Sequence, residues 1–572
     1  MINWDREADL VVVGSGAAGM SAAIVAAASG LDALVLEKTD RIGGSTAISG
    51  GVVWVPGNRG MAEAGAPDPP GAALRYLEQV IGPALRRDMI ETYVRVSPEM
   101  VDWFNSQSAV RLVPRMYAPD YQSELDGASQ GGRALDPLEY DGRKLGRWFD
   151  RLRAPLPQTM IFGGMMVSRA DIDHLQRAFR SWTSFRHAVR ILLGHARDRL
   201  RFARGARLLA GNALAARLLR SAVDRGVRFE TGADVTALLS DGGAVIGAEA
   251  VIGGETVRIR ARRGVVLAAG GGAANAHIRA AHVPHADVHL SMAPEGSAGD
   301  GLALAVAAGG TIGETVANAV FLTPVSVDAA GGKRTLFPHL ILDRQKPGLI
   351  AVNSAGRRFV NEADSYHDFV EGMYRDQGDG PAIPAWLIAD SRFVRKYGLG
   401  LVRPAPFSKR GFIRSGYLVS ARTIDELAAK VGVPKAQLAA TIEAANQAAA
   451  TGFDPAFGKG SSGYNRYLGD ASHSPNPCLG PIRTPPFHAV RIWPGDIGAA
   501  RGIRTDVEAR VLDAHDEPVR GLYACGNDMH SIMGGSYPAG GITLGPAMTF
   551  GFIAARHAAG NSPRGSEKEK TA

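Results

Sequence analysis

The sequence has only two cysteines and lacks a long uninterrupted apolar run. Cys478 and Cys525 are too few, in 572 residues, for a disulfide framework or for a metal site built on cysteine pairs. The apolar stretch at residues 17–36 is broken by two serines, a glycine and an aspartate, so it is a buried helix and strand rather than a membrane span. The opening residues, MINWDREADL, contain no secretory stretch. These absences predict a cytoplasmic protein, with membrane association at the inner face left open.

Acidic residues are almost missing from one part of the chain. Charged residues make up 21% of the sequence and apolar residues 45%, which is ordinary for a globular protein. Between residues 176 and 220, however, eleven arginines accompany a single acid, Asp198. This segment carries a net charge of +10, eleven minus one, which exceeds the formal net charge of +8 for the whole chain.

The order of apolar segments predicts a parallel sheet interrupted by a second domain. An apolar strand at 9–13, a tight turn at 14–19, a helix at 20–29 and a strand at 33–36 form one βαβ unit. A basic helical segment follows at 171–225, and strand patterns return at 227–230, 244–252, 265–268 and 521–525. Residues 313–490 are less periodic and richer in aromatic residues and proline. We therefore expect one discontinuous domain, 1–312 and 491–572, and a second domain at 313–490.

A glycine motif lies between the first strand and the first helix. Gly14 permits the tight turn, Gly16 lets a pyrophosphate approach the backbone, and Gly19 lets the helix pack closely on the strand. The helix N-terminus offers free N–H groups to the phosphates. Glu37 follows eighteen residues after Gly19, where its carboxylate can accept hydrogen bonds from ribose hydroxyls. The motif predicts a bound dinucleotide, but NAD and FAD share it.

Further segments distinguish the two cofactors by resemblance. Residues 41–51, 268–271, 299–301 and 521–527 resemble, in order, those of the fumarate reductase and 3-ketosteroid dehydrogenase flavoprotein superfamily. The resemblance implies an α/β fold, with a glutathione-reductase-like (Rossmann-type) FAD-binding domain and an inserted α+β catalytic cap domain. Members with covalent flavin carry a histidine in the region of residues 45–47; none is present here, so we expect non-covalent FAD. The cofactor contacts expected on this basis are Gly14, Gly16, Ala18, Gly19, Glu37, Lys38, Gly44, Ser45, Thr46, Ser49, Gly50, Gly51, Val235, Ala269, Gly270, Asp300, Gly526, Asn527, Gly541, Thr543 and Leu544.

The C-terminal turn at 534–551 resembles that of the 3-ketosteroid dehydrogenases. By this resemblance, the Tyr537 hydroxyl and the Gly541 N–H hold the substrate ketone oxygen as an oxyanion hole. Tyr366, in the segment 356–367, lies where the family has its proton-abstracting tyrosine. A tyrosine with a pKa of ~10 needs a second hydroxyl or a positive field to act as a base near neutral pH. Tyr121 is the candidate helper, and Tyr117 competes with it for that role.

The resemblance implies an FAD-dependent dehydrogenase for a bulky apolar ketone, with a 3-ketosteroid desaturated at its 1,2 bond as the expected substrate. Electrons would then pass to an external acceptor. A fumarate-reductase-type ene-reductase remains an alternative, although no arginine lies between residues 360 and 374 to grip a dicarboxylate. A 4-dehydrogenating ketosteroid enzyme is a closer alternative. Asp528 and His530 are polar residues not expected together in the steroid enzymes, which leaves a different bulky ketone open.

The basic segment also carries an apolar stripe. Phe179, Trp182, Phe185, Val189 and Leu192 recur at spacings of three or four within the arginine-rich stretch 179–204. Such a pattern fits contact with a membrane surface. The interpretation that we favour is a surface helix whose stripe packs on the FAD domain. A basic membrane-binding or nucleic-acid-binding flavoprotein without enzymatic activity is the third possibility, but no nucleic-acid recognition motif accompanies the charge, so we expect no nucleic acid.

Overall fold

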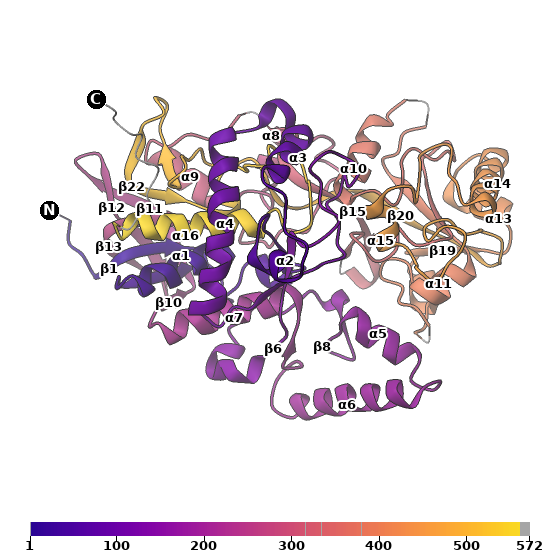
Figure 1. Cartoon of the computed structure of the whole chain (residues 1–572), viewed down its shortest axis with the longest axis horizontal. Helices are drawn as coiled ribbons and strands as arrows, with labels where there is room; N and C mark the ends of the chain where they lie inside the picture. The colour runs from indigo at the N-terminus through magenta and orange to yellow at the C-terminus, as the bar shows by residue number, and fades with distance from the viewer. Residues whose placement is uncertain (1, 315, 333, 379, 406, 561–572) are drawn as a thin grey trace.

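The computed structural model describes residues 2–314, 316–332, 334–378, 380–405 and 407–560. Two sheets organise these residues, and they lie at opposite ends of the long axis of the molecule (Figure 1). Within the described ranges, no helix combines the length and the apolar character that a membrane span needs.

The first sheet has eight strands and joins both ends of the chain. Its order is β10 (Arg228–Thr231), β2 (Ala33–Glu37), β1 (Arg6–Val13), β13 (Glu255–Leu267), β12 (Ala244–Ile252), β22 (Pro518–Ala524) and β21 (Arg510–Leu512), with β11 (Ala233–Asp241) paired to β12. β1 is parallel to both β2 and β13, and β13 is parallel to β22. The parallel sheet that the βαβ pattern predicted is therefore present.

Both faces of this sheet are covered, which explains why the central strands β1 and β13 end in continuous apolar runs, Leu10–Val13 and Val265–Leu267. Along β1, Leu10 and Val12 face one core, which contains α1 (Ala17–Ala28) and α16 (Leu544–Ala558). Val11 and Val13 face a second core, which contains Leu304 of α9 (Asp300–Ala307). α1 begins four residues after β1 ends, so its N-terminus lies at the carboxyl end of β1.

The second sheet has seven strands, in the order β16 (Thr335–Pro338), β15 (Val320–Asp328), β20 (Phe487–Ala499), β18 (Ala385–Ala389) and β17 (Leu349–Val352), with β14 (Leu290–Ser291) and β19 (Leu418–Ala421) paired to β20. One face packs on α10 (Tyr366–Arg375), and the other packs on α13 (Ile424–Val431) and α14 (Lys435–Thr451). This sheet includes β14 and the last nine residues of β20, which lie outside 313–490. The domain limits at 312/313 and 490/491 stay a prediction.

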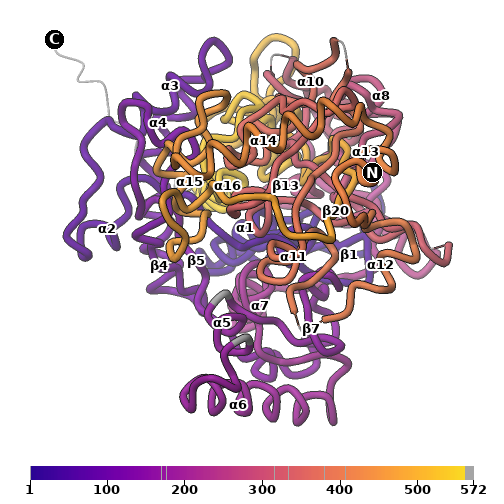
Figure 2. Tube along the Cα trace, turned by 90° about the vertical axis from the view of Figure 1, so that its right-hand side faces the viewer, coloured from indigo at the N-terminus to yellow at the C-terminus, as the bar shows by residue number. Residues whose placement is uncertain are grey.

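The basic segment forms a helical hairpin that projects from the body. α5 (Arg169–Gln176) and α6 (Trp182–Arg199) lie apart from both sheets in the two views, whereas α7 (Ala210–Asp224) packs beside α1 (Figures 1 and 2). Phe179 is 97% exposed and Trp182 is 72% exposed. The favoured interpretation, in which the stripe packs on the FAD domain, was therefore wrong: the inward face of α6 uses small and polar residues such as Ser184 and Ala188 instead.

Candidate active site

The glycine turn after β1 leaves one open face. A Cβ on Gly14 would lie 2.3 Å from the Ala268 carbonyl oxygen, and a Cβ on Gly19 would lie 2.0 Å from the Gly14 carbonyl oxygen. Both glycines are therefore required by the packing of β1, α1 and β13. At Gly16, in contrast, a Cβ would meet nothing nearer than the Thr46 hydroxyl at 3.8 Å. This open side lies at the N-terminus of α1, where a pyrophosphate fits the free N–H groups.

The serine- and glycine-rich loop after β2 lies against this turn. A Cβ on Gly44 would be 3.5 Å from the Gly16 Cα, and the Thr46 hydroxyl accepts a hydrogen bond of 2.9 Å from the Ala17 N–H. Gly51 has a left-handed φ of +72°, and a Cβ there would lie 2.4 Å from the main chain of α7. The loop is thus held between α1 and α7: the contact with α7 requires glycine at position 51, and Gly44 adjoins the open side of Gly16.

Glu37 ends β2 beside the turn, and protein donors already bind both of its oxygens. Oε2 accepts from the Ser15 N–H at 3.1 Å, and Oε1 accepts from the Thr39 N–H at 3.0 Å. Each oxygen also accepts a second hydrogen bond, Oε2 from the Ser15 hydroxyl at 2.5 Å and Oε1 from the Thr39 hydroxyl at 2.8 Å. The Thr39 hydroxyl can donate to the Arg41 carbonyl at 2.9 Å instead, which would free Oε1 for a ribose hydroxyl. Lys38, the next residue, pairs with Asp300 at 3.1 Å.

The remaining expected cofactor contacts lie around the same end of the sheet. Gly526 and Asn527 follow β22, and a Cβ on Gly526 would lie 2.8 Å from the Ala18 side chain. Thr543 precedes the first residue of α16. Residues at the carboxyl ends of neighbouring parallel strands meet at one edge, which accounts for this convergence. The other contacts are placed on the 44–51 loop, on β11, after β13 and at the start of α16: Ser45, Ser49, Gly50, Val235, Ala269, Gly270 and Leu544.

Asp528, which the sequence could not explain, supports this edge. Its side chain is fully buried, and its two oxygens accept from the Ala269 N–H at 2.6 Å and the Gly271 N–H at 2.8 Å. Burial raises the pKa of this carboxyl to about 6, although both N–H groups oppose the shift. Asp528 therefore shapes the loop after β13 rather than a substrate site.

Three tyrosines from distant parts of the sequence meet in one cluster. The Tyr121 and Tyr366 hydroxyl oxygens are 3.1 Å apart. The Tyr537 ring lies 5.1 Å from the Tyr366 ring and is stacked on the Tyr121 ring at 5.8 Å. Tyr117, the competitor of Tyr121, is 84% exposed and lies outside the cluster. The structure thus brings together the three tyrosines that the sequence motifs singled out.

A fourth tyrosine adjoins the cluster, and no motif had identified it. Tyr464, on α15 (Gly463–Leu468), has its ring 4.5 Å from the Tyr121 ring. Its side chain is buried, and burial raises the pKa of its hydroxyl. On the other side, the Phe321 ring meets the Tyr537 ring edge-on at 5.3 Å. The cluster is therefore enclosed by aromatic rings, which suit an apolar substrate.

Burial raises the pKa of each tyrosine in the cluster. Desolvation is the largest cause for Tyr366 and Tyr121, whose pKa values lie well above the ordinary value. Burial also raises the pKa of Tyr537, against hydrogen bonding by Tyr366 and Thr543. All three are therefore neutral hydroxyls near neutral pH and can donate hydrogen bonds.

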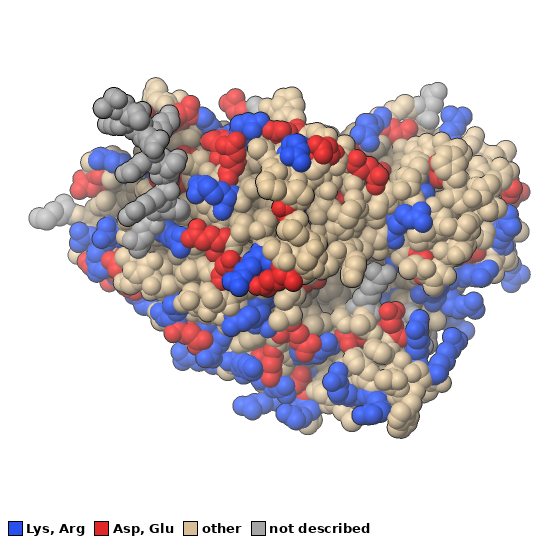
Figure 3. Space-filling view, in the orientation of Figure 1, with Lys and Arg blue, Asp and Glu red and all other residues tan. Residues whose placement is uncertain are grey.

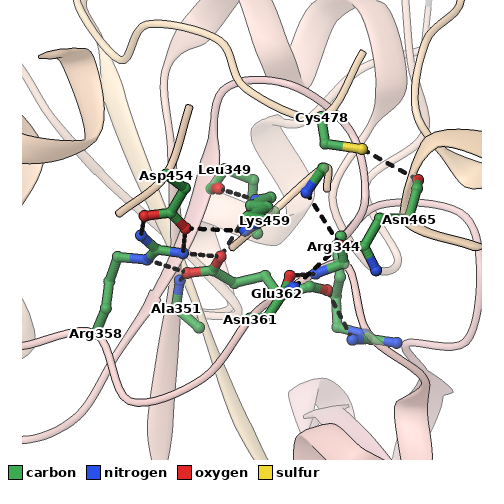
Figure 4. Close-up of polar contacts among 12 residues, drawn as sticks. Arg344, Leu349, Ala351, Arg358, Asn361, Glu362, Asp454, Lys459, Asn465 and Cys478 are labelled. Atoms are coloured by element: carbon green, nitrogen blue, oxygen red, sulfur yellow. Dashed lines mark hydrogen bonds and ion pairs between the residues drawn. The ribbon is translucent and has the colours of Figure 1, made fainter. Parts of the chain in front are cut away.

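A buried charge network fixes the loop that leads to Tyr366. Burial would raise the pKa of Glu362, but Arg358 and Lys459 lower it to about 2, so the carboxylate is ionised. Arg358 lies 2.7 Å and Lys459 3.4 Å from this carboxylate (Figure 4). Arg344 donates to the main-chain carbonyls of Glu362 and Asp364. These contacts hold the start of α10, and hence Tyr366, in one position.

Gly541 lies four residues after Tyr537 and three residues before the start of α16. Its φ of +101° is left-handed, and a Cβ would lie 2.7 Å from the main-chain nitrogen of Trp54. Its carbonyl accepts a hydrogen bond of 3.1 Å from the Trp54 N–H. Only glycine fits at this close approach.

Comparisons with known proteins identify the family of this chain. A family model described as FAD binding domain matches residues 9–544. The chain is 39% identical to 4-oxocyclohex-2-ene-1-carboxylate 5-dehydrogenase of Sinomonas cyclohexanicum, covering 96% of this chain and 93% of that protein. It is 36% identical to 3-oxosteroid 1-dehydrogenase of Mycolicibacterium smegmatis, covering 96% and 97%. The structure of 3-ketosteroid delta1-dehydrogenase from Sterolibacterium denitrificans, in complex with 1,4-androstadiene-3,17-dione, superposes with a TM-score of 0.89 at 35% identity, covering 97% of this chain and 100% of that one.

The family model spans residues 9–544, and the two relatives match along 93% and 97% of their own lengths. The parallel sheet and the glycine turn at residues 14–19 are consistent with an FAD-binding protein. The chain belongs to the FAD binding domain family, and it is an FAD-dependent dehydrogenase, acting on CH–CH groups, of the ketosteroid and oxocyclohexane carboxylate type.

Proposed function

We propose that this enzyme introduces a double bond next to the carbonyl of a cyclic apolar ketone, with the 1,2 bond of a 3-ketosteroid as the favoured position. The observation that carries the proposal is the convergence of Tyr121, Tyr366 and Tyr537 beside Gly541. The names of the relatives share a ring ketone, whether the ring belongs to a steroid or to a cyclohexane carboxylate. A ketone oxygen is the group that two convergent donors can polarise.

Each residue has one role in this mechanism. The Tyr537 hydroxyl and the Gly541 N–H donate to the ketone oxygen, which stabilises enolate-like charge and makes the neighbouring C–H more acidic. Tyr366 takes the α-proton. The Tyr121 hydroxyl, whose oxygen lies 3.1 Å from that of Tyr366, stabilises the charge on the Tyr366 oxygen. FAD, when bound at the glycine turn of residues 14–19, supplies the acceptor for the hydride that leaves the β-carbon. The surrounding aromatic rings exclude water from the reacting atoms.

The substrate class is tested by anaerobic bleaching of the flavin. A panel should contain a saturated or 4-ene 3-ketosteroid, 4-oxocyclohexanecarboxylate and a saturated dicarboxylate. We expect bleaching by the ketones and none by the dicarboxylate, because the dicarboxylate has no ketone oxygen for the proposed donors of the tyrosine cluster to polarise. Product analysis separates 1,2-desaturation from 4-dehydrogenation. Bleaching by the dicarboxylate alone would instead support the ene-reductase alternative.

The flavin should leave the protein on denaturation. The segment at residues 45–47 contains no histidine for a covalent bond, so only non-covalent contacts hold the cofactor. We expect acid precipitation to yield a colourless pellet and a supernatant that contains FAD. Yellow colour that stays with the pellet after washing would contradict this prediction.

We further propose that the α5–α6 hairpin contacts a membrane surface. The apolar stripe of α6 faces solvent among arginines, and the same region of the space-filling view shows basic side chains around an uncharged surface (Figure 3). Exposed aromatic residues among cations are typical of interfacial helices. Such contact would bring a water-insoluble ketone close to the enzyme.

Vesicle binding tests the hairpin directly. Arg186 and Arg190 are exposed on α6, and each basic residue near an anionic surface contributes about 1 kcal/mol. Reversing both with Glu should lower partitioning to anionic vesicles by about tenfold or more, and added salt should weaken binding of the parent protein. The matched control reverses Arg410 and Arg414, which are exposed on α12 (Arg410–Arg414). Equal partitioning of the parent and both variants would refute membrane contact.

A further inference from the structure

Trp54 joins two parts of the candidate active site. It lies on β3 (Val53–Trp54), in a small sheet with β5 (Ala134–Pro137) and β4 (Leu112–Pro114), and its side chain is fully buried. Its main-chain N–H donates to the Gly541 carbonyl at 3.1 Å. Its indole Nε1–H donates to Asp120 Oδ1 at 2.8 Å. One residue therefore binds both the segment of the ketone-polarising amide and the residue next to Tyr121.

The contact with Gly541 leaves little freedom. A Cβ on Gly541 would lie 2.7 Å from the main-chain nitrogen of Trp54 and 2.8 Å from the Val52 carbonyl oxygen. The Trp54 carbonyl in turn accepts from the buried Tyr93 hydroxyl. The main chain of Trp54 is thus held on one side by α4 (Arg87–Gln107) and holds Gly541 on the other.

The contact with Asp120 is equally constrained. Asp120 Oδ2 accepts from Arg133 Nη1 at 2.7 Å and from the Ser129 N–H at 2.9 Å. Arg133 also binds both oxygens of Asp68, at 2.7 and 2.8 Å, and its side chain is only 2% exposed. A buried carboxylate with both oxygens hydrogen-bonded is costly to distort, because a lost partner leaves an uncompensated charge. Asp120 is therefore a rigid anchor for the residue that follows it.

Tyr121 extends this anchor to the reacting groups. Its main-chain N–H donates to the Pro538 carbonyl at 2.9 Å, one residue after Tyr537. Its hydroxyl is 3.1 Å from that of Tyr366, and its ring stacks on Tyr537. A displacement of Asp120 would therefore move the Tyr121 hydroxyl relative to both the proposed base and the ketone donors.

We propose that Trp54 is a positioning residue that sets the placement of the Tyr121 hydroxyl relative to Gly541, through its indole N–H and its main-chain N–H. The proposal rests on the proposed function, because it concerns the tyrosines that act on the ketone. Trp54 acts through the two residues to which it donates, Asp120 and Gly541. Placement within fractions of an ångström decides how well an acid–base pair works.

Replacing Trp54 with phenylalanine removes the indole N–H together with the five-membered part of the ring. A six-membered ring and the main-chain bond to Gly541 remain, but Asp120 Oδ1 loses its donor. We expect flavin reduction by an accepted ketone to slow about tenfold, while flavin content and the Kd of the ketone stay within about twofold. Trp103→Phe is the matched control: this tryptophan packs half-buried on the same core, against Phe104 and Phe552. Its reduction rate should stay near that of the parent.

A double-mutant cycle distinguishes positioning from a general loss of packing. If the indole N–H acts through the Tyr121 hydroxyl, Trp54→Phe should slow a Tyr121→Phe enzyme by less than about twofold. If Trp54 only supports the core, the two effects on the rate should multiply. Thermal melting of all three variants identifies any that are partly unfolded.

The outcomes separate this inference from the proposed function. Multiplying effects, or an unchanged rate in Trp54→Phe, would overturn the positioning role even when Tyr121→Phe itself slows the enzyme. If the parent enzyme does not reduce its flavin with any cyclic ketone, or if Tyr121→Phe and Tyr366→Phe both reduce it at the parent rate, the proposed function fails instead.

Discussion

Replacing Tyr366 with phenylalanine should slow flavin reduction by on the order of a hundredfold or more, which is the usual contribution of a positioned acid–base group. The change removes one oxygen and keeps the ring, which packs against Tyr121 and Tyr537. The fold and the flavin content should therefore be unaffected. Stopped-flow measurement with a bleaching ketone gives the rate constant directly.

The pH dependence provides a second test of the same residue. Burial raises the pKa of Tyr366, so its proton-accepting form is scarce near neutral pH and increases as the pH rises. The rate of flavin reduction should therefore rise with pH, without a plateau up to about pH 10, the ordinary tyrosine pKa. In Tyr366→Phe this rise should disappear.

Tyr374 offers a matched control on the same helix. It lies on α10, two turns after Tyr366, and its buried hydroxyl has no partner among the described residues. Tyr374→Phe should leave both the rate and its pH dependence near those of the parent. If Tyr366→Phe and Tyr374→Phe behave alike, Tyr366 is a packing residue and the base lies elsewhere.

The nucleotide-binding part of the fold could be predicted from sequence because its signals are local. The apolar strand, the glycine turn and the helix lie within a few residues of each other, and the steric demands on Gly14 and Gly19 come from elements that they join. The α/β class and the parallel sheet follow from the same pattern. The second sheet was less accessible, because β14 contributes only two residues and pairs with a strand about 200 residues later.

The tyrosine cluster shows where sequence reasoning ends. Tyr366 and Tyr537 lie in segments that resemble family motifs, so they could be named in advance. Tyr464 lies in no such motif, and only folding brings its ring to 4.5 Å from Tyr121. The stripe that includes α6 was expected to pack on the FAD domain, because periodicity identifies an apolar face but does not say what covers it.

The second large effect on the rate of flavin reduction is expected from Tyr537, one of the two proposed donors to the ketone oxygen. Tyr537→Phe removes one of two proposed hydrogen bonds to the ketone oxygen, and the loss of one such donor typically costs ~10²–10³ in rate. The Tyr537 ring is enclosed by Tyr121, Tyr366 and Phe321, so phenylalanine should fill the same space. The Gly541 amide remains, and some activity should therefore persist.

The pattern of kinetic constants decides what Tyr537 does. A donor that acts mainly on developing enolate charge lowers the reduction rate and changes ketone affinity little, because the neutral ketone needs it less than the transition state does. Tyr523→Phe is the control: this buried tyrosine binds His557 at 2.9 Å and belongs to β22, away from the cluster. Tyr537→Phe could instead raise only the Kd of the ketone and reduce its flavin at the parent rate when the ketone is saturating. In that case, the hydroxyl binds substrate but does not stabilise the transition state. An unchanged rate in both Tyr537→Phe and Tyr366→Phe would limit the likeness to the steroid dehydrogenases to the fold and the cofactor.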